Sequence, residues 1–518
     1  MKSKSFKTQT HHDRDADGES MAALMDRPGN AVSANNGTVS GGWPVPSKDD
    51  LLVVTVGGVD EIGMNFTMYG RDGKWIIVDA GVGFTTNEEK KTSGVTGRTV
   101  SFETIRPIAK DIVGMVITHA HADHIEGING VLQHLDIPVY ATPFACCLIG
   151  KKNPDADLRE FVSGDLLEIE DFDIQTIATT HSIPESNHLF ISGRDQEKGI
   201  LHTGDWKFDL QNPNSKVDID TLARLGDERR VMAVVGDSTN ARRDGHTPEE
   251  ASVIPGLAHV MKTCTGRVHA VCFASNVDRV DVIHRVAMEH GRIVAPSGRT
   301  LLDNIGIATD LGYIDGDSMV KADELRKYDR NRTVLIMTGT QGEENATLAR
   351  LIDSGVDGQK NRLPMPQSGD ALIYSARCIP GNEQAVNEIL DRYRALGVTV
   401  ISDDRPEPGF VYPVHVSGHP ARDDLKNLLE LTDPDNVIPV HGHRKDMEAH
   451  AELAEGMGIA SFIPKIGCVM DVKPEGIREI AVIPVYVDEQ TAKISKGRER
   501  RRGHDYAKKS HRQRGMEF

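Results

Sequence analysis

The sequence predicts an α/β protein in which one β-sheet packs on another beneath helices and a separate region forms a parallel sheet. Three observations lead to this fold class. Short apolar runs that are typical of strands follow one another closely in the first half of the chain. Strand and helix patterns then alternate between residues 241 and 395, which is the order that builds a parallel sheet. After residue 396 the histidine-rich pattern of the first half resumes.

The first folded region is predicted to contain several buried strands. Leu51–Val56 is an apolar run that ends at a Gly-Gly pair, and Trp75–Asp79 follows a turn. Ile112–Ile117, Ile137–Tyr140 and Val231–Val235 are further strand candidates. Strands at this density, with helical patterns between them, favour a two-sheet core that is covered by helices.

The middle region alternates between the two periodicities. Val268–Phe273, Val334–Met337 and Ala371–Tyr374 are strand candidates, and Asp278–Val286 keeps its apolar positions at helical spacing. Residues 355–370 contain two prolines and three glycines and are predicted to form a loop. This βαβα order predicts a parallel sheet with its own helices.

Composition limits the class of protein. With 518 residues, we expect two or three domains. The sequence contains neither the ~18-residue apolar stretch of a membrane span nor a secretory signal, so we expect a cytoplasmic protein without membrane contact. A reducing compartment also fits the six cysteines, which show no CxxC spacing and are predicted to be free thiols. They are Cys146, Cys147, Cys264, Cys272, Cys378 and Cys468.

The two ends of the chain differ from the rest. Residues 1–49 are polar and lack periodicity, which predicts a disordered tail. Residues 491–518 hold ten Lys or Arg against three Asp or Glu, and therefore form a basic end. The whole chain carries a formal net charge of −17, which excludes a protein that simply coats nucleic acid.

Metal chemistry is indicated by the segment His119-Ala120-His121-Ala122-Asp123-His124, which follows a predicted strand. Histidines two apart on an extended segment project to the same side. Neutral imidazole and carboxylate groups are the ligands that zinc takes in hydrolytic sites. A lone histidine is more often a core or surface residue, but this cluster after a strand favours a metal site.

Three more candidate ligands follow apolar runs, and with the four above they make seven. They are His181 after Ile174–Ala178, Asp205 after Gly199–Leu201, and His441 after Asn436–Ile438. Two zinc ions about 3.5–4 Å apart need roughly this number, with one carboxylate bridging them. The predicted cofactor is therefore two Zn²⁺ per chain, and Mn²⁺ or iron would also suit these ligands.

The order of these residues resembles that of the metallo-β-lactamase fold. Asp79 matches its first motif, a structural aspartate that orients the metal-binding loop. The His119–His124 segment matches the second motif, His181 the third and Asp205 the fourth. The long gap from Asp205 to His441 is where a β-CASP domain is inserted in the nucleases of this superfamily. Three further motifs of that subgroup are matched by Asp237, His419 and His441.

The resemblance implies an α/β fold made of a metallo-β-lactamase αββα sandwich with an inserted parallel α/β β-CASP domain. The expected limits are 1–49 for a disordered tail, 50–240 and 396–488 for the two parts of the metallo-β-lactamase domain, 241–395 for the β-CASP domain, and 489–518 for a basic tail.

Within the β-CASP group, the chain most resembles the ribonuclease J family. The matching segments are GGVDEIGMN at 57–65, THSIPES at 180–186, TGDWKFD at 203–209, GDSTNA at 236–241, FASN at 273–276, TGTQGE at 338–343, IPGNE at 379–383 and HVSGH at 415–419. The resemblance covers about residues 51–475. It implies a zinc-dependent ribonuclease that degrades single-stranded RNA 5′→3′ from a 5′-monophosphate, with internal cleavage as a second activity.

The chain also departs from the family pattern. Only a short basic tail stands where the family usually carries a C-terminal domain that helps to form dimers, so the oligomeric state is open. His443 stands in place of a usual Glu, Ala122 in place of a common Glu, Glu126 in place of Gly, and Asp278 in place of His. These departures remove none of the seven predicted ligands.

The resemblance also assigns roles to individual residues. Asp123 and Asp205 act in catalysis through the metal ions, and His419 is the candidate general acid, oriented by Asp237. An Asp at position 237 could instead cap a helix. His415 and Ser417 resemble a pocket for the 5′-monophosphate, with a solvated loop as the alternative. Candidate RNA-backbone contacts are Asn276, Arg279 and Arg299, the last of which could equally form a surface salt bridge.

Two other functions compete with the ribonuclease hypothesis. One is a β-CASP nuclease that acts on DNA, against which the ribonuclease J-like segments argue. The other is a non-catalytic RNA-binding protein, whose signature would be the loss of ligands, and here all seven are present. A small-molecule hydrolase of this fold would not need the roughly 150-residue insertion.

Overall fold

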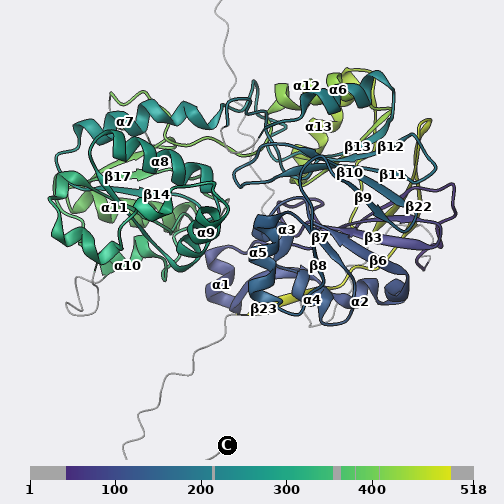
Figure 1. Cartoon of the computed structure of the whole chain (residues 1–518), viewed down its shortest axis with the longest axis horizontal. Coiled ribbons are helices and arrows are strands. Elements are labelled where there is room, and N and C mark those ends of the chain that lie inside the picture. The colour runs from purple at the N-terminus through teal and green to yellow at the C-terminus, as the bar shows by residue number, and fades with distance from the viewer. Residues whose placement is uncertain are drawn as a thin grey trace, which may run out of the picture.

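The computed structural model describes residues 42–212, 216–353, 363–379, 381–405, 407 and 409–491. These residues form two lobes (Figure 1). The larger lobe contains two packed sheets with helices on the outside, and the smaller lobe is built around one five-stranded sheet. Within the described residues, no helix is long and apolar enough to cross a membrane.

The first sheet of the larger lobe has eight strands. In spatial order they are β22 (Gly476–Val482), β21 (Cys468–Lys473), β1 (Leu52–Thr55), β2 (Thr67–Arg71), β3 (Lys74–Val78), β6 (Ile112–Val116), β7 (Val139–Ala141) and β8 (Leu158–Glu160). Strands from β22 to β3 pair antiparallel, and those from β3 to β8 pair parallel. The C-terminal part of the chain thus completes a sheet that begins at residue 52.

The second sheet has seven strands. They are β20 (Ala460–Ser461), β19 (Asn436–Val440), β13 (Val231–Asp237), β12 (Gly199–His202), β11 (Asn187–Gly193), β10 (Phe172–Ala178) and β9 (Leu166–Ile169). Strands β12, β13 and β19 run parallel to one another, so their carboxyl ends lie at the same edge. A three-stranded sheet of β23 (Val487–Thr491), β5 (Val95–Val100) and β4 (Val82–Gly83) completes the lobe.

The core explains why the predicted strands are apolar without interruption. In β1, Val53 faces a cluster shared with the second sheet, which includes Ile174 and Ile200. Its neighbours Leu52 and Val54 belong to a different cluster, together with Phe144 of a covering helix. Both faces of the strand are therefore buried, and the simple alternation of polar and apolar residues is lost.

Helices cover both outer faces of the sandwich (Figure 1). On the seven-stranded sheet lie α6 (Ile219–Asp227), α12 (Arg422–Thr432) and α13 (Arg444–Gly456). On the side of the eight-stranded sheet lie α1 (Asn87–Ser93), α2 (Phe102–Ile105), α3 (Ala122–Ile125), α4 (Ile128–Leu132) and α5 (Pro143–Lys152). This is the αββα sandwich that the sequence predicts.

The smaller lobe holds a fully parallel sheet. Its strands, in spatial order, are β15 (Ile293–Ser297), β16 (Thr333–Met337), β14 (Val268–Val271), β17 (Ala371–Tyr374) and β18 (Thr399–Ser402). Its helices are α7 (Ile254–Thr263), α8 (Val277–Glu289), α9 (Arg299–Asp310), α10 (Thr347–Asp353) and α11 (Glu383–Ala395). The predicted fold class, a two-sheet sandwich with an inserted parallel α/β domain, is confirmed.

Three segments differ from the expected limits. Strand β18 lies beyond residue 395 yet belongs to the sheet of the smaller lobe. Trp43, placed in the predicted tail, packs edge-on against Trp75 at 5.2 Å between ring centroids and donates a hydrogen bond to the carbonyl of Thr104. Strand β23 extends three residues into the predicted basic tail and pairs with β5. Residues 1–41 and 492–518 lie outside the described residues, as do 354–362 of the predicted loop.

Hydrogen bonds join the two lobes away from the covalent connections. The side chain of Asn87 donates to the carbonyl of Gln341 at 2.6 Å, and its backbone N–H donates to the side chain of Asn382 at 2.9 Å. On another face, the hydroxyl of Tyr313 donates to Glu185 at 2.6 Å. These contacts fix the smaller lobe against the loops that carry the candidate site.

Candidate functional site

The predicted metal ligands lie where strands of both sheets end. His119 and His121 follow β6, and the short helix α3 begins between them and Asp123. From the second sheet, His181, Asp205 and His441 follow β10, β12 and β19. Because β12, β13 and β19 run parallel, the side chains that follow them meet at one edge.

The structure brings all seven predicted ligands together. Their ligand atoms form overlapping groups, in each of which the atoms lie within 4.8 Å of one another. One group is His119, His121, His181 and Asp205, and the second is Asp123, His124, Asp205 and His441. A third joins Asp205 and His441 to Asp237 and His419. Asp205 is the member common to all three groups.

The carboxylate of Asp205 faces both sets of imidazoles. Its Oδ2 lies 3.3 Å from Nε2 of His124 and 3.7 Å from Nε2 of both His119 and His181. Its Oδ1 lies 3.5 Å from Nε2 of His441. This Oδ1 is buried and has no hydrogen-bond donor among the described residues. A buried carboxylate oxygen without a donor is costly unless a cation holds it, so the donor set fits two metal ions with Asp205 between them.

Residues behind the ligands fix the orientation of their rings. Nδ1 of His124 donates to Oδ2 of Asp79 at 2.7 Å, and the backbone N–H of Thr118 donates to the other oxygen of Asp79 at 2.8 Å. Nδ1 of His181 likewise donates to the carbonyl of Gly418 at 2.6 Å. Since a carboxylate or a carbonyl can only accept, the proton lies on Nδ1 and the lone pair of Nε2 is left for a metal.

The protonation of three ligands suits metal binding. Burial lowers the pKa of His119 and of His181 well below the ordinary value, and it lowers the pKa of His121 to about 3. These imidazoles are therefore neutral at physiological pH, which is the form that coordinates a metal.

His419 forms a separate pair at the edge of this cluster. Its Nδ1 lies 2.8 Å from Oδ2 of Asp237 and 3.9 Å from Oδ2 of Asp205. Burial would lower the pKa of His419, but the carboxylates of Asp237 and Asp205 outweigh it and raise the pKa to about 9. The alternative role of Asp237 as a helix cap is wrong, because the described residues that follow it form a turn in which it accepts from the N–H of Thr239.

His415 and Ser417 lie on a loop that is tied to the GDSTNA segment. The hydroxyl of Ser417 accepts from Nδ2 of Asn240 at 2.9 Å and from the backbone N–H of His419 at 3.2 Å. The same Nδ2 donates to the carbonyl of His419 at 3.2 Å. Asn240 was not among the sequence candidates, although it belongs to a segment that the sequence singles out. This loop is held by neighbouring side chains, which argues against the solvated-loop alternative.

The three candidate RNA contacts have different surroundings. Arg279 is fully buried, where its guanidinium binds Glu250 and the hydroxyl of Ser375, so a direct contact with RNA was wrong. Asn276 is also buried, and its Oδ1 accepts the backbone N–H of Arg279 to cap α8. Arg299 begins α9, is exposed, and takes part in no ion pair within the described residues.

A buried group of charges behind His415 was missed by the sequence reasoning. Nζ of Lys207 lies 3.4 Å from Asp209 and 3.8 Å from Glu250, and Glu250 also holds Arg279. A guanidinium nitrogen of Arg279 lies 3.4 Å from Nδ1 of His415. Burial, with Arg279 as the next cause, lowers the pKa of His415 to about 3. Lys207 lies in the TGDWKFD segment, which was the one available signal.

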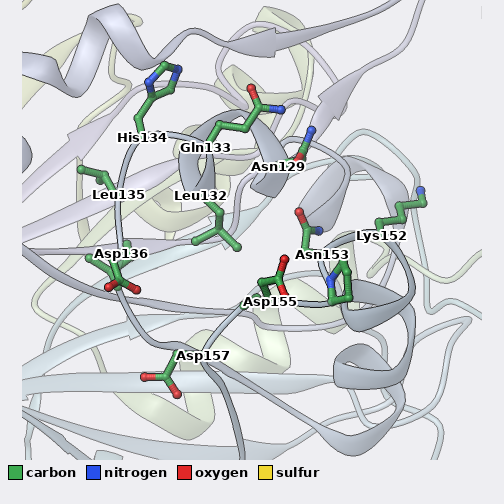
Figure 2. A pocket seen from close by; sticks show the side chains of 13 residues that line it. Asn129, Leu132, Gln133, His134, Leu135, Asp136, Lys152, Asn153, Asp155 and Asp157 are labelled. Carbon is green, nitrogen blue, oxygen red and sulfur yellow. The ribbon is translucent and has the colours of Figure 1, made fainter.

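A cavity of about 490 Å³ lies elsewhere on the larger lobe. It is lined by α4, the end of α5 and the loops that follow these helices, and Figure 2 shows its largely polar walls. The labelled side chains include Gln133, Asn153 and Asp157. None of its lining residues belongs to the histidine–aspartate cluster, so this hollow is separate from the candidate metal centre.

Comparison with known proteins agrees with the fold and the site. Residues 60–260 match the metallo-beta-lactamase superfamily, residues 265–393 the beta-CASP domain of ribonuclease J, and residues 408–464 the RNA specificity domain of Zn-dependent metallo-hydrolases. Among solved structures, a protein of unknown function from Enterococcus faecalis V583 aligns with 82% of this chain and all of its own, with a TM-score of 0.57 and 15% identity. That likeness concerns the fold alone.

Curated relatives are more similar in sequence. Ribonuclease J of Sinorhizobium meliloti is 34% identical over 429 residues, which is 81% of this chain and 73% of the relative. Ribonuclease J of Mycolicibacterium smegmatis is 36% identical over 426 residues, 80% and 73% of the two chains. Ribonuclease J2 of Bacillus subtilis is 30% identical over 445 residues, 83% and 77% of the two chains. Against ribonuclease J of Helicobacter pylori, the chain spans 64% of the relative's length.

The sandwich fold and the clustered ligands define a metal-dependent hydrolase of the metallo-β-lactamase superfamily. With the β-CASP match and these relatives, the chain belongs to the ribonuclease J family. The predicted resemblance is thereby confirmed.

Gly81→Ala should reduce the metal content without altering any ligand. A Cβ at this position would lie 1.5 Å from the backbone oxygen of Asp123, so the ligand-bearing helix α3 must shift. We expect less zinc per chain and a lower melting temperature. Gly130→Ala is the control, since its Cβ meets no atom within 4 Å, and it should keep both values. Full zinc content in the Gly81→Ala protein would contradict this account of how the loop is held.

Proposed function

We propose that this protein is a ribonuclease that uses two zinc ions to hydrolyse RNA from a 5′-monophosphate end in the 5′→3′ direction. The observation that carries the proposal is the position of Asp205, whose two oxygens face both groups of ligands. Internal cleavage by the same centre and a role in cytoplasmic RNA processing and decay belong to the proposal. Mn²⁺ is the alternative ion, because the same imidazoles and carboxylates would bind it.

The ligands divide into two sets around the bridging carboxylate. His119, His121 and His181 would hold one ion, and Asp123, His124 and His441 the other. Such ions lower the pKa of bound water and neutralise charge on a phosphodiester. Asp79 keeps the ring of His124 in one orientation, so that the arrangement exists before RNA binds.

The leaving 3′-oxygen needs a proton, and His419 is the group suited to give it. The ring lies beside the ligands, at 5.0 Å from His181 between ring centroids, yet its Nδ1 is engaged by Asp237. The Asp237 carboxylate favours the imidazolium, so that a proton is available at neutral pH. In this proposal, Asp237 is a positioning residue and His419 is the catalytic acid.

The hydroxyl of Ser417 is suited to a terminal phosphate. It accepts two hydrogen bonds from Asn240 and His419, which leaves its own proton to donate. A pocket that holds the end of the RNA near the ions sets the distance to the scissile bond, which supports stepwise release of nucleotides. Membership of the ribonuclease J family favours RNA over the alternative of DNA.

His419→Ala should lower the turnover number by about 10²–10⁴-fold, the range typical of general acid catalysis. Zinc content should stay at the wild-type value, because Nδ1 of His419 is committed to Asp237. Asp237→Asn should give a smaller loss of turnover, since it removes the charge that favours the imidazolium. Single-turnover cleavage and elemental analysis on the same samples test this. Loss of zinc from His419→Ala would make this residue a ligand instead.

The 5′-end preference is tested with three RNAs of one sequence that carry a 5′-monophosphate, a 5′-triphosphate or a 5′-hydroxyl. Fully metallated protein should digest the monophosphate fastest. Ser417→Ala should slow exonucleolytic digestion of that RNA by about 10-fold or more, because a charge-assisted hydrogen bond contributes about 1.5–3 kcal/mol. Internal cleavage should slow less. Equal rates on the three RNAs with the wild-type protein would refute the end-binding pocket.

A further inference from the structure

Arg377 is an exposed cation beside the loop of Ser417. It lies three residues beyond the end of β17, at the carboxyl edge of the parallel sheet in the smaller lobe. A guanidinium nitrogen donates to Oδ1 of Asn240 at 3.2 Å. Nδ2 of the same Asn240 donates to the hydroxyl of Ser417 at 2.9 Å. One buried side-chain amide therefore joins the guanidinium to the hydroxyl that is proposed to bind RNA.

The direction of each hydrogen bond follows from chemistry. Nδ2 of Asn240 must be the donor because one of its partners, the carbonyl of His419, can only accept. The opposite end of the amide is then Oδ1, which can only accept, and the guanidinium can only donate. The orientation of Asn240 is therefore fixed, and with it the position of the Arg377 guanidinium relative to Ser417.

Arg377 also supplies charge that the surrounding residues do not cancel. Behind His415, the two cations Lys207 and Arg279 are balanced by the two carboxylates Asp209 and Glu250. Arg377, by contrast, takes part in no ion pair within the described part of the chain. Its charge is close enough to contribute to the lowered pKa of His415. The surroundings of His415 and Ser417 therefore carry a net positive charge that comes from the smaller lobe.

We propose that Arg377 binds the 5′-terminal phosphate of the RNA together with Ser417, and that Asn240 positions it. This inference rests on the proposed function and adds the residue that makes the site specific for a charged 5′ end. One nitrogen of the fork is held by Asn240, and the remaining donors are free for phosphate oxygens. A monophosphate presents a dianionic group at the terminus, whereas a 5′-hydroxyl presents no charge there. Arg377 therefore discriminates between these two ends.

The test compares kcat/KM on 5′-monophosphate and 5′-hydroxyl RNAs of one sequence, and the ratio of the two values is the readout. Arg377→Ala should lower this ratio by about 10- to 100-fold, as expected for loss of a charge-assisted hydrogen bond. Arg377→Lys should give an intermediate ratio, because the charge stays and the planar fork is lost. Arg332→Ala is the control, as Arg332 is an exposed arginine of the same lobe with no ion pair among the described residues. It should keep the wild-type ratio.

Two results would overturn the proposal in different ways. If the wild-type protein prefers the monophosphate and Arg377→Ala keeps the same ratio, Arg377 does not bind the terminal phosphate. An equal loss on both RNAs would show that it binds the RNA body instead. If the wild-type protein shows no preference between the two ends, the end-binding pocket fails together with Arg377. Zinc content and melting temperature of each variant show that the protein is folded and metallated.

Discussion

The architecture of the site depends on one buried carboxylate, that of Asp205. It is placed by β12 at the edge where three parallel strands end, and imidazoles from both sheets surround it. An ionised carboxylate in such a position is stable only if charge or hydrogen bonds compensate it. The imidazoles of His441 and His124 depress the pKa of Asp205 despite its burial. The oxygen Oδ1 still has no donor among the described residues, which is what a cation would satisfy.

The surrounding fold exists to bring distant segments to this carboxylate. His119 and His441 are separated by more than 300 residues, and the intervening smaller lobe is inserted without disturbing the second sheet, in which β13 pairs directly with β19. The smaller lobe in turn reaches back to the site. Arg279 lies beside His415, and Arg377 bonds Asn240. The metal centre thus belongs to the larger lobe, while the charge for recognising the end of the RNA comes from the smaller one.

The sequence predicted best what is local and chemically distinctive. The His119–His124 segment identifies itself, because few structures other than a metal site explain four such groups after a strand. His441 could be assigned only through the order of motifs, since nothing in the residues beside it marks a ligand. The prediction for Arg279 was wrong, because the burial of an arginine depends on Glu250, 29 residues away, and no local pattern reveals that pairing. Strand β18 and Trp43 were misplaced for the same reason: their partners in the sheet and the core are remote in sequence.

The central claim is that Asp205 bridges two metal ions. Anomalous diffraction at the zinc edge, from crystals of the zinc-loaded protein, tests it most directly. The account predicts two peaks about 3.5–4 Å apart, one among His119, His121 and His181 and the other among Asp123, His124 and His441, each within bonding distance of an Asp205 oxygen. A single peak, or two peaks that both lie away from Asp205, would contradict it.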